Sequence, residues 1–188
     1  MDADPSTKLL WRKPPLRLEA ETIRDSMLKV SGLLNGKMFG SPEPIKRGPD
    51  GQWVEQDGKA NPNRRSLYLA QTRTRPVAFL HAFDAPDMTS DNQAQRFRSA
   101  LPAQSLALLN SPLVMRASKA FSQQLLEQSK GNFDEALKMA FQAAYSRRPA
   151  SQELEIAKKS IAEDSDPKEG LRLFLQAMMG ASDFLYSY

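Results

Sequence analysis

Hydrophobic residues recur at helical spacing in one stretch near the start of the chain and over most of its second half. Between residues 16 and 34 the apolar positions follow one another at alternating steps of four and three, which places them on one stripe of a helix. These positions are Leu16, Ala20, Ile23, Met27, Val30 and Leu34. The following Asn35-Gly36 is a typical C-terminal stop. The pattern predicts an amphipathic helix over 16–34.

Five further helices are expected after residue 98, because apolar stripes there begin at capping residues. The expected segments are 99–109, 112–130, 132–145, 152–162 and 167–179. Ser99 and Ser111 are candidate N-caps with a proline in the first turn, and Asn132 and Asp166 are each followed three residues later by Glu. Leu106 and Leu109 form the expected inner face of the first segment. In the segment 132–145, Ala136, Ala140, Ala143 and Ala144 are small enough for another helix to approach closely.

Residues 36–83 carry a different pattern. The span 36–63 is dominated by Gly, Pro, Asn and charge, and within it 45–55 fits either a small hairpin around Gly48-Pro49-Asp50-Gly51 or an irregular loop. Residues 66–72 alternate and predict a short strand near Leu67, while 77–83 fit a short helix or a buried extended run.

The fold class that follows is mainly α: a compact bundle of five or six helices with a loop-rich insert and a small β element. At 188 residues and 40% hydrophobic content the chain forms a single helical domain, 1–188. We divide it into an N-terminal segment and first helix (1–35), an irregular insert (36–63), a signature segment (64–112) and a helical bundle (113–188).

The composition of the chain excludes several kinds of cofactor and metal site. The chain has no cysteine, which excludes disulfides, thiolate zinc sites, iron–sulfur ligation and C-x-x-C-H haem attachment, and we expect no cofactor and no metal on this chain. The net charge of +4 is spread over interspersed signs without a basic run, so nucleic acid is not a favoured partner, although weak non-specific binding stays open. No apolar run approaches membrane-spanning length, and residues 1–6 do not resemble a signal peptide.

Several sequence motifs occur together in a characteristic order. The central ones are RRSLYL at 64–69, FDAPD at 83–87 and RSALPAQSLALLNSP at 98–112. The outer ones are LLWR at 9–12, the stretch 17–34, YSRRPASQEL at 145–154 and SDFLYSY at 182–188. In this combination the chain resembles the C-terminal planctomycete-type domain of unknown function (the PSD-type domain). The matches cover most of the chain, and a further N-terminal helical portion usual in the family is absent.

The resemblance implies a context and not an activity. Such domains follow cytochrome c-like domains in large exported, multidomain proteins, often linked with polysaccharide degradation. It implies a periplasmic or extracellular location, and other domains of the same polypeptide as partners. The chain would then be a fragment of a larger multidomain protein.

The candidate site residues all lie in the signature segment. Asp84 and Asp87, three apart across a proline, could bind a hard cation or act as general acid and base; they could equally cap a turn or pair with arginines. His81 lies in an apolar run, which favours a partly buried, hydrogen-bonded histidine over a catalytic one. Leu9, Leu10 and Trp11 are expected to dock onto the body.

Arginines flank the acidic pair in the sequence on both sides, and Arg64, Arg65, Arg96 and Arg98 are candidate ligand-binding residues. They could bind sulfate, phosphate or carboxylate groups, or could pin an irregular segment through ion pairs. We favour a non-catalytic structural or interaction domain of a larger exported, haem-associated protein. The alternatives are binding or cleavage of sulfated or acidic polysaccharide by an Asp/Arg cluster, and weak nucleic-acid binding.

Overall fold

The computed structural model describes residues 13–56, 63–86, 96 and 98–187. Within them the protein has eight α-helices, one short 3-10 helix and two small two-stranded sheets, which confirms the mainly α fold class. The six longer helices are α1 (Ala20–Val30), α3 (Pro102–Asn110), α4 (Pro112–Gln128), α5 (Phe133–Tyr145), α6 (Ser151–Ala162) and α7 (Pro167–Gly180). The two short ones are α2 (Ala78–Ala82) and α8 (Ser182–Leu185).

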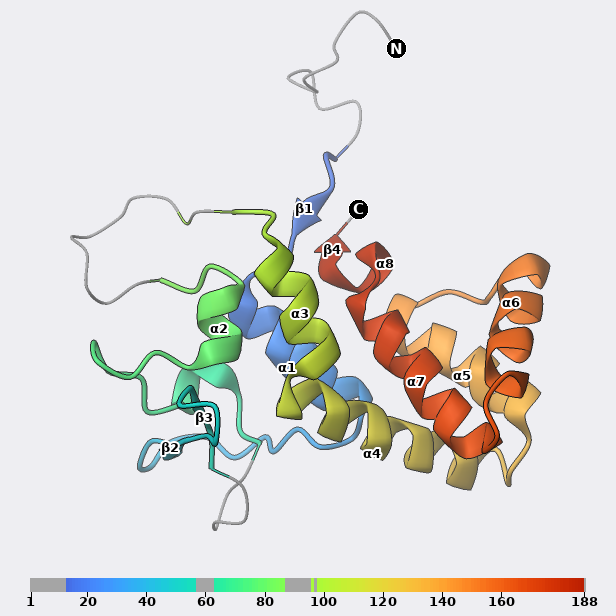
Figure 1. Ribbon diagram of the computed structural model, residues 1–188, viewed down its shortest axis with the longest axis horizontal. Helices are drawn as coiled ribbons and strands as arrows, with labels where there is room; N and C mark the ends of the chain where they lie inside the picture. Colours follow the sequence, from blue (N-terminus) through green and yellow to red (C-terminus); the bar gives the residue numbers. More distant parts are fainter. Residues whose placement is uncertain (1–12, 57–62, 87–95, 97, 188) are drawn as a thin grey trace, which may run out of the picture.

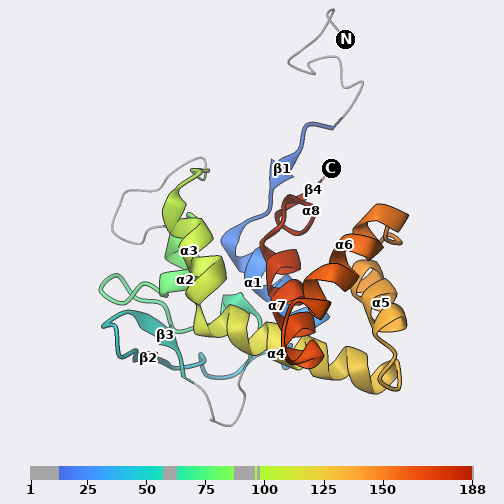
Figure 2. The ribbon, with the colours of Figure 1, turned by 45° about the vertical axis from the view of Figure 1, so that its right-hand side comes forward.

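The centre of the bundle is the crossing of α4 and α7. Helix α4 runs along the base of both ribbon views and α7 lies against it, with α5 and α6 at one end and α2, α3 and a β hairpin at the other (Figures 1 and 2). Phe121 of α4 and Leu171 and Leu175 of α7 are buried here, so much of the contact is apolar, and Arg172 of α7 also donates to the hydroxyl of Ser118 of α4 at 3.5 Å. Burial of such side chains contributes roughly 1.5–3 kcal/mol each.

Capping side chains fix the starts of the later helices close to where the sequence predicts them. Asn132 Oδ1 accepts the backbone N–H of Glu135 at 3.2 Å, and Asp166 Oδ1 accepts that of Lys168 at 3.0 Å. Glu153 reaches back to the N–H of Ala150 at 2.7 Å and caps α6. These local bonds satisfy N–H groups that a helix leaves without intrahelical partners.

The first helix is shorter at both ends than the predicted 16–34. Leu16–Arg17 forms strand β1 and pairs antiparallel with Tyr186–Ser187 (β4), so the chain is extended there. Helix α1 ends at Val30 because Gly32 adopts a left-handed φ of 70°, and the N–H groups of Leu33 and Leu34 turn back to the carbonyl of Leu28. The apolar spacing continues past this turn, and for this reason the helix predicted from the spacing extends beyond the actual end of α1.

The small β elements lie elsewhere than near Leu67. Ile45–Arg47 (β2) and Trp53–Glu55 (β3) form an antiparallel hairpin, which confirms that alternative for 45–55. The predicted strand at 66–72 is wrong: Ser66–Tyr68 forms the 3-10 helix η1, in which the N–H groups of Tyr68 and Leu69 donate to the carbonyls of Arg65 and Ser66. The β pairing in 66–72 is limited to isolated bridges of Leu69 with Glu43 and of Thr72 with Arg75. Residues 77–83 contain the short helix α2.

Helix α3 is rotated relative to the sequence prediction. Leu108 and Gln104 are buried, whereas Leu106 and Leu109 are 58% and 61% exposed. Ser99 is not its N-cap; Leu101 occupies that position. Helix α3 packs on α2, α4 and α7, and Gln176 of α7 donates to the carbonyls of Leu108 and Leu109, which fixes the helix in this orientation.

Gly170 sets the distance between α6 and α7, and its replacement is the first testable prediction. A Cβ there would lie 2.6 Å from the carbonyl oxygen and 3.0 Å from the Cα of Ile161, which are backbone atoms that cannot rotate aside. Gly170→Ala is expected to lower the free energy of unfolding by about 1–3 kcal/mol, measured by chemical denaturation. Gly180→Ala in the same helix is the control, because its Cβ would meet only Leu108 side-chain atoms at 3.7 and 3.8 Å. Equal stability of the two variants would contradict the close helix contact.

Candidate functional site

Three buried arginines connect the loops of the signature segment to the rest of the domain: Arg17, Arg24 and Arg64. Arg17 is the last residue of β1, Arg24 lies in the middle of α1, and Arg64 precedes η1. Each meets a different set of acceptors. Of the candidate residues, Arg64 is one of the three, and Asp84 is a partner of Arg17.

Asp84 ends α2 and is held by three groups. Its φ of 61° and the bond from the N–H of Ala85 to the carbonyl of Leu80 are typical of the residue that terminates a helix in the left-handed conformation. Its carboxylate accepts the N–H of Ser99 at 2.8 Å and the hydroxyl of Ser99 at 2.7 Å, and forms an ion pair with Arg17. The carboxylate therefore joins three segments of the chain.

The pKa of Asp84 agrees with these hydrogen bonds and with the ion pair. Burial acts to raise the pKa of Asp84, but the N–H of Ser99, the guanidinium of Arg17 and the hydroxyl of Ser99 together lower it below its ordinary value. Arg17 also donates to Gln104 Oε1 at 3.1 Å. Asp84 is thus an ionised, hydrogen-bonded carboxylate, which is the form that a structural ion pair requires.

Of the other two catalytic candidates, only His81 lies among the described residues, and it does not join this cluster. Asp87, like Leu9, Leu10 and Trp11, lies outside the described residues. His81 is exposed and not partly buried as predicted, because α2 turns Phe79 and Leu80 toward the core. Among the residues that the structure describes, no group of three or more His, Cys, Asp or Glu is placed to hold a metal ion.

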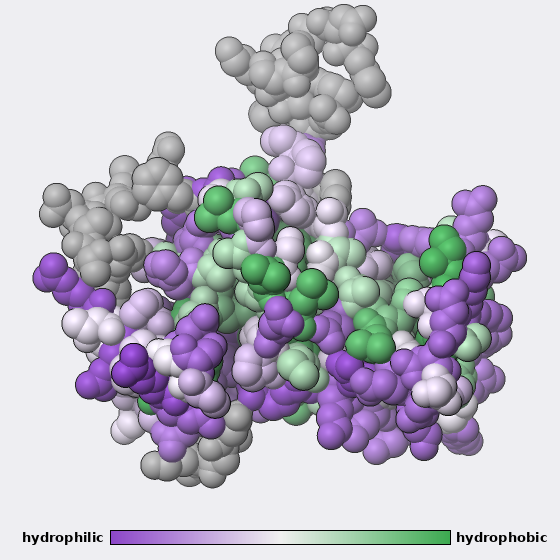
Figure 3. Space-filling model, in the orientation of Figure 1, coloured by the Kyte–Doolittle hydropathy of each residue, from purple (hydrophilic) through white to green (hydrophobic). Residues whose placement is uncertain are grey.

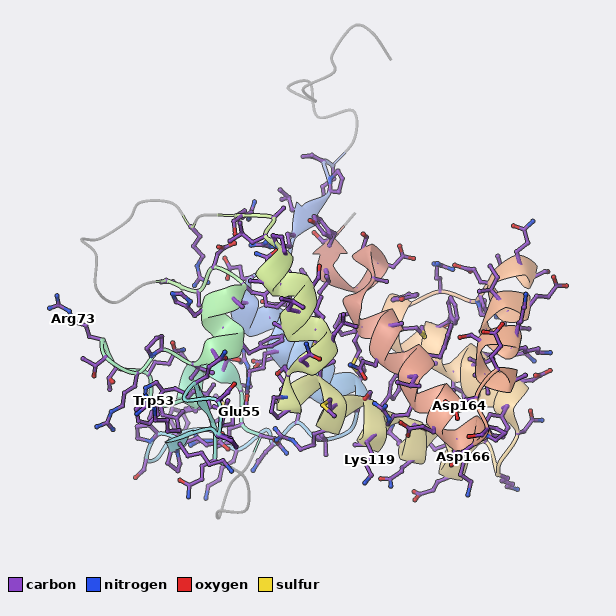
Figure 4. All side chains as sticks on the ribbon, viewed as in Figure 1. Trp53, Glu55, Arg73, Lys119, Asp164 and Asp166 are labelled. Carbon is purple, nitrogen blue, oxygen red and sulfur yellow. The ribbon has the colours of Figure 1, made fainter. Side chains whose placement is uncertain are left out.

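Arg24 joins α1 to η1 and to the hairpin. Its side chain is 0% exposed; it forms an ion pair with Glu55 and donates to the carbonyl of Arg64 at 2.8 Å and to the hydroxyl of Ser66 at 3.2 Å. Glu55 comes from β3, beside the first turns of α4, and also accepts from Arg116 at 2.8 Å (Figure 4). One guanidinium therefore links elements that are distant in sequence.

The next residue, Asp25, binds the same turn. Its carboxylate accepts the backbone N–H of Ser66 at 2.8 Å and the hydroxyl of Ser66 at 2.7 Å. Together with Arg24 it explains why Ser66 begins a 3-10 turn on α1 and not a strand.

Arg64 holds the loop that follows α1. Its guanidinium donates to the carbonyls of residues 37, 39 and 41 at 3.1, 2.7 and 2.9 Å, and lies over the Tyr68 ring at 3.8 Å. Its backbone N–H donates to Glu43 at 3.1 Å; burial nevertheless raises the pKa of Glu43. The guanidinium donors of Arg64 are therefore directed at the backbone of the loop 37–41.

The remaining candidate arginines lie at the surface. Arg65 contacts Asp25 at 3.4 Å, Arg96 contacts Glu21 at 2.7 Å, and Arg98 is exposed. Arg73 points away from the body of the protein (Figure 4). The ion pair to Asp84 comes from Arg17, which sequence reasoning did not select. Its position between Leu16 and Leu18 carries no signal of a site.

A groove of about 1050 Å³ runs along α1. One wall is α1 with Thr22, Ser26 and Val30, and the other is the end of α5 with Ala143 and Ala144. Leu67, Leu69, Phe184 and Tyr186 contribute apolar surface at its sides. The one feature of the sequence that indicated this groove was the set of small residues in α5, which can let another helix approach closely.

The polar lining of the groove is largely paired within the protein. Glu21 meets Arg96 and Asp25 meets Arg65, so acids and bases at the rim neutralise one another. Tyr145 at the end of α5 donates its hydroxyl to the carbonyl of Met178 at 2.9 Å, and burial raises the pKa of Tyr145 to about 12. The groove therefore presents small and apolar groups together with charges that are mostly paired, and Lys29 of α1 also lines it.

These features define a helical domain in which internal arginine and carboxylate contacts hold irregular loops in place beside a neutral groove. The chain belongs to the PSD1 family, described as a protein of unknown function (DUF1553), whose model matches residues 1–161. This confirms the resemblance over most of the chain. Neither the curated proteins nor the solved structures provide a match. None of the described helices is long and apolar enough to cross a membrane.

Proposed function

We propose that the chain is a non-catalytic interaction domain of a larger exported, haem-associated protein, and that it packs on another domain of the same polypeptide through the groove along α1. The observation that carries the proposal is the groove itself, about 1050 Å³ beside a central helix. The exported, periplasmic or extracellular context rests on the family resemblance. The cofactor chemistry of that larger protein would belong to its other domains.

The lining of the groove favours a helix as its occupant. Ser26 on α1 and Ala143 and Ala144 on α5 are small, and small residues on facing helices let a third backbone approach closely. Four acids and three bases line the groove (Glu19, Glu21, Asp25 and Asp183; Lys29, Arg65 and Arg96), so its charges nearly balance and favour neither sign of ligand. An amphipathic helix that offers an apolar stripe fits these walls, and a polyanion does not.

The polysaccharide alternative has less support from the geometry. Asp84 is ionised and bound by Arg17 and Ser99, and the donors of Arg64 are directed at carbonyls of its own loop. Arg65 and Arg96 each contact an acid of α1. Within the described residues, the candidate arginines do not converge on one open site.

Filling the groove tests the proposal. The adjoining upstream segment of the same polypeptide is produced separately and titrated into this chain by calorimetry. Ala143→Trp is expected to weaken binding at least about tenfold, because the indole occupies the space of the incoming helix. Gln142→Trp is the matched control, since Gln142 is the exposed neighbour of Ala143 on α5 and does not line the groove.

Hydrogen exchange locates the contact: amides of α1 and of the end of α5 should exchange more slowly in the complex. Absence of binding by the adjoining segment, or equal binding by Ala143→Trp, would overturn the proposal. Saturable binding of a sulfated polysaccharide that is lost in Arg96→Ala or Arg98→Ala would favour the alternative instead.

A further inference from the structure

Helices α3 and α7 expose leucines side by side on one face of the molecule. Leu106 and Leu109 of α3 and Leu173 of α7 are solvent-exposed, as is Leu101, which directly precedes α3. The space-filling view shows hydrophobic surface gathered over these two helices in the middle of the visible face (Figure 3). We call Leu101, Leu106, Leu109 and Leu173 the leucine face. None of its residues lines the groove along α1.

The fold itself does not require this surface to be apolar. A helix on the surface of a globular protein normally has polar residues on the side opposite the core. Helix α3 already buries Leu108 toward α7, yet its solvent side carries two more leucines. Large apolar patches on protein surfaces mark interaction sites more often than isolated exposed leucines do.

The leucine face also lacks charge. Residues 99–115 contain no Asp, Glu, Lys or Arg, in a chain of which 26% of residues are charged. On α7, the guanidinium of Arg172, beside Leu173, is drawn aside to Glu169 at 2.6 Å and to Gln176 at 2.9 Å. The amide of Gln176 in turn satisfies the carbonyl of Leu109 at 2.7 Å. Arg172 and Gln176, the polar side chains of α7 beside the face, are thus bonded within the domain.

We propose that the leucine face binds the same face of a second copy of this chain in a two-fold symmetric dimer. In such a contact each residue near the axis meets its own copy, so any charge there would repel itself. The four leucines of the face, three of which lie in the charge-free stretch 99–115, meet that condition. Leu106 and Leu109 are three residues apart on α3 and form a ridge that two copies can interdigitate.

Sedimentation equilibrium from low micromolar to submillimolar concentration tests the dimer. The wild-type chain is expected to dimerise, and Leu106→Glu and Leu109→Glu each to raise the dissociation constant at least about tenfold, because a buried charge would face its own copy. Both leucines are exposed, so circular dichroism and the melting temperature should show that each variant folds.

Two controls separate this surface from others. Ile156→Glu replaces another exposed apolar residue, on α6, and Ala143→Trp alters only the groove; both should dimerise as the wild type does. A chain that stays monomeric at every concentration would overturn the proposal. So would equal weakening by Ile156→Glu, or assembly that continues beyond the dimer.

Discussion

Replacement of Arg24 by methionine is expected to lower the free energy of unfolding by about 3–5 kcal/mol. The methionine fills a similar volume in α1 but removes all the donors of the guanidinium. Glu55 would lose a buried ion pair, and the carbonyl of Arg64 would lose its 2.8 Å hydrogen bond. A buried acceptor without a partner loses its hydration without compensation, so the cost exceeds that of an ordinary hydrogen bond.

Chemical denaturation of the purified chain measures this effect, and Arg65→Met is its control. Arg65 contacts Asp25, the residue next to Arg24, but its side chain is 63% exposed and the contact is 3.4 Å. The control should change stability by less than about 1 kcal/mol, because surface ion pairs contribute little. Adding Glu55→Gln to Arg24→Met should recover part of the loss. Equal losses in Arg24→Met and Arg65→Met would contradict the assigned network.

Asp84→Asn is expected to cost about 3 kcal/mol at neutral pH, because it leaves the buried Arg17 without its charge partner. The pKa of Asp84 lies below its ordinary value of 3.8 in the folded protein. A carboxyl with a lowered pKa stabilises the fold fully above its unfolded pKa and loses that contribution as pH falls through its folded pKa. The difference between wild type and Asp84→Asn should therefore be constant above about pH 5 and shrink at more acid pH.

Unfolding curves recorded across this pH range test both parts of the expectation. Ser99→Ala removes the hydroxyl but keeps the N–H that Asp84 accepts, so it should cost only about 1 kcal/mol. Glu163→Gln, an exposed acid after α6, is the matched control and should show neither effect. If the difference for Asp84→Asn did not change with pH, Asp84 would not be the ionised partner of Arg17.

Helices α4 to α7 were predictable because their signals are local, whereas the short helix α8 was not predicted. Asn132 and Asp166 cap the helices that they precede, and the apolar stripes of α4 and α7 meet each other. Helix α1 was placed correctly but overextended, since nothing in the apolar spacing shows that Gly32 reverses the chain. The orientation of α3 could not be read from its sequence, because leucines lie on both of its sides and only packing on α7 decides which side is buried.

The site was less predictable, because its contacts are distant in sequence. Arg17 and Asp84 are separated by 67 residues, and Arg24 and the carbonyl of Arg64 by 40. Residue types in the signature segment indicated that charges would meet there, but not which ones. Arg64 was selected as a ligand-binding residue, and its actual acceptors are backbone carbonyls, which no sequence pattern displays.

The pairing of β1 with β4 determines how the domain would respond to tension. Leu16 lies opposite Ser187 and Arg17 opposite Tyr186, so the first and last strands of the described chain lie side by side. A pull on both ends opens these backbone pairs one after another, as a zipper, and does not shear them together. The next contact in line is Arg17 with Asp84, so the same ion pair that orders the signature segment resists peeling of the ends.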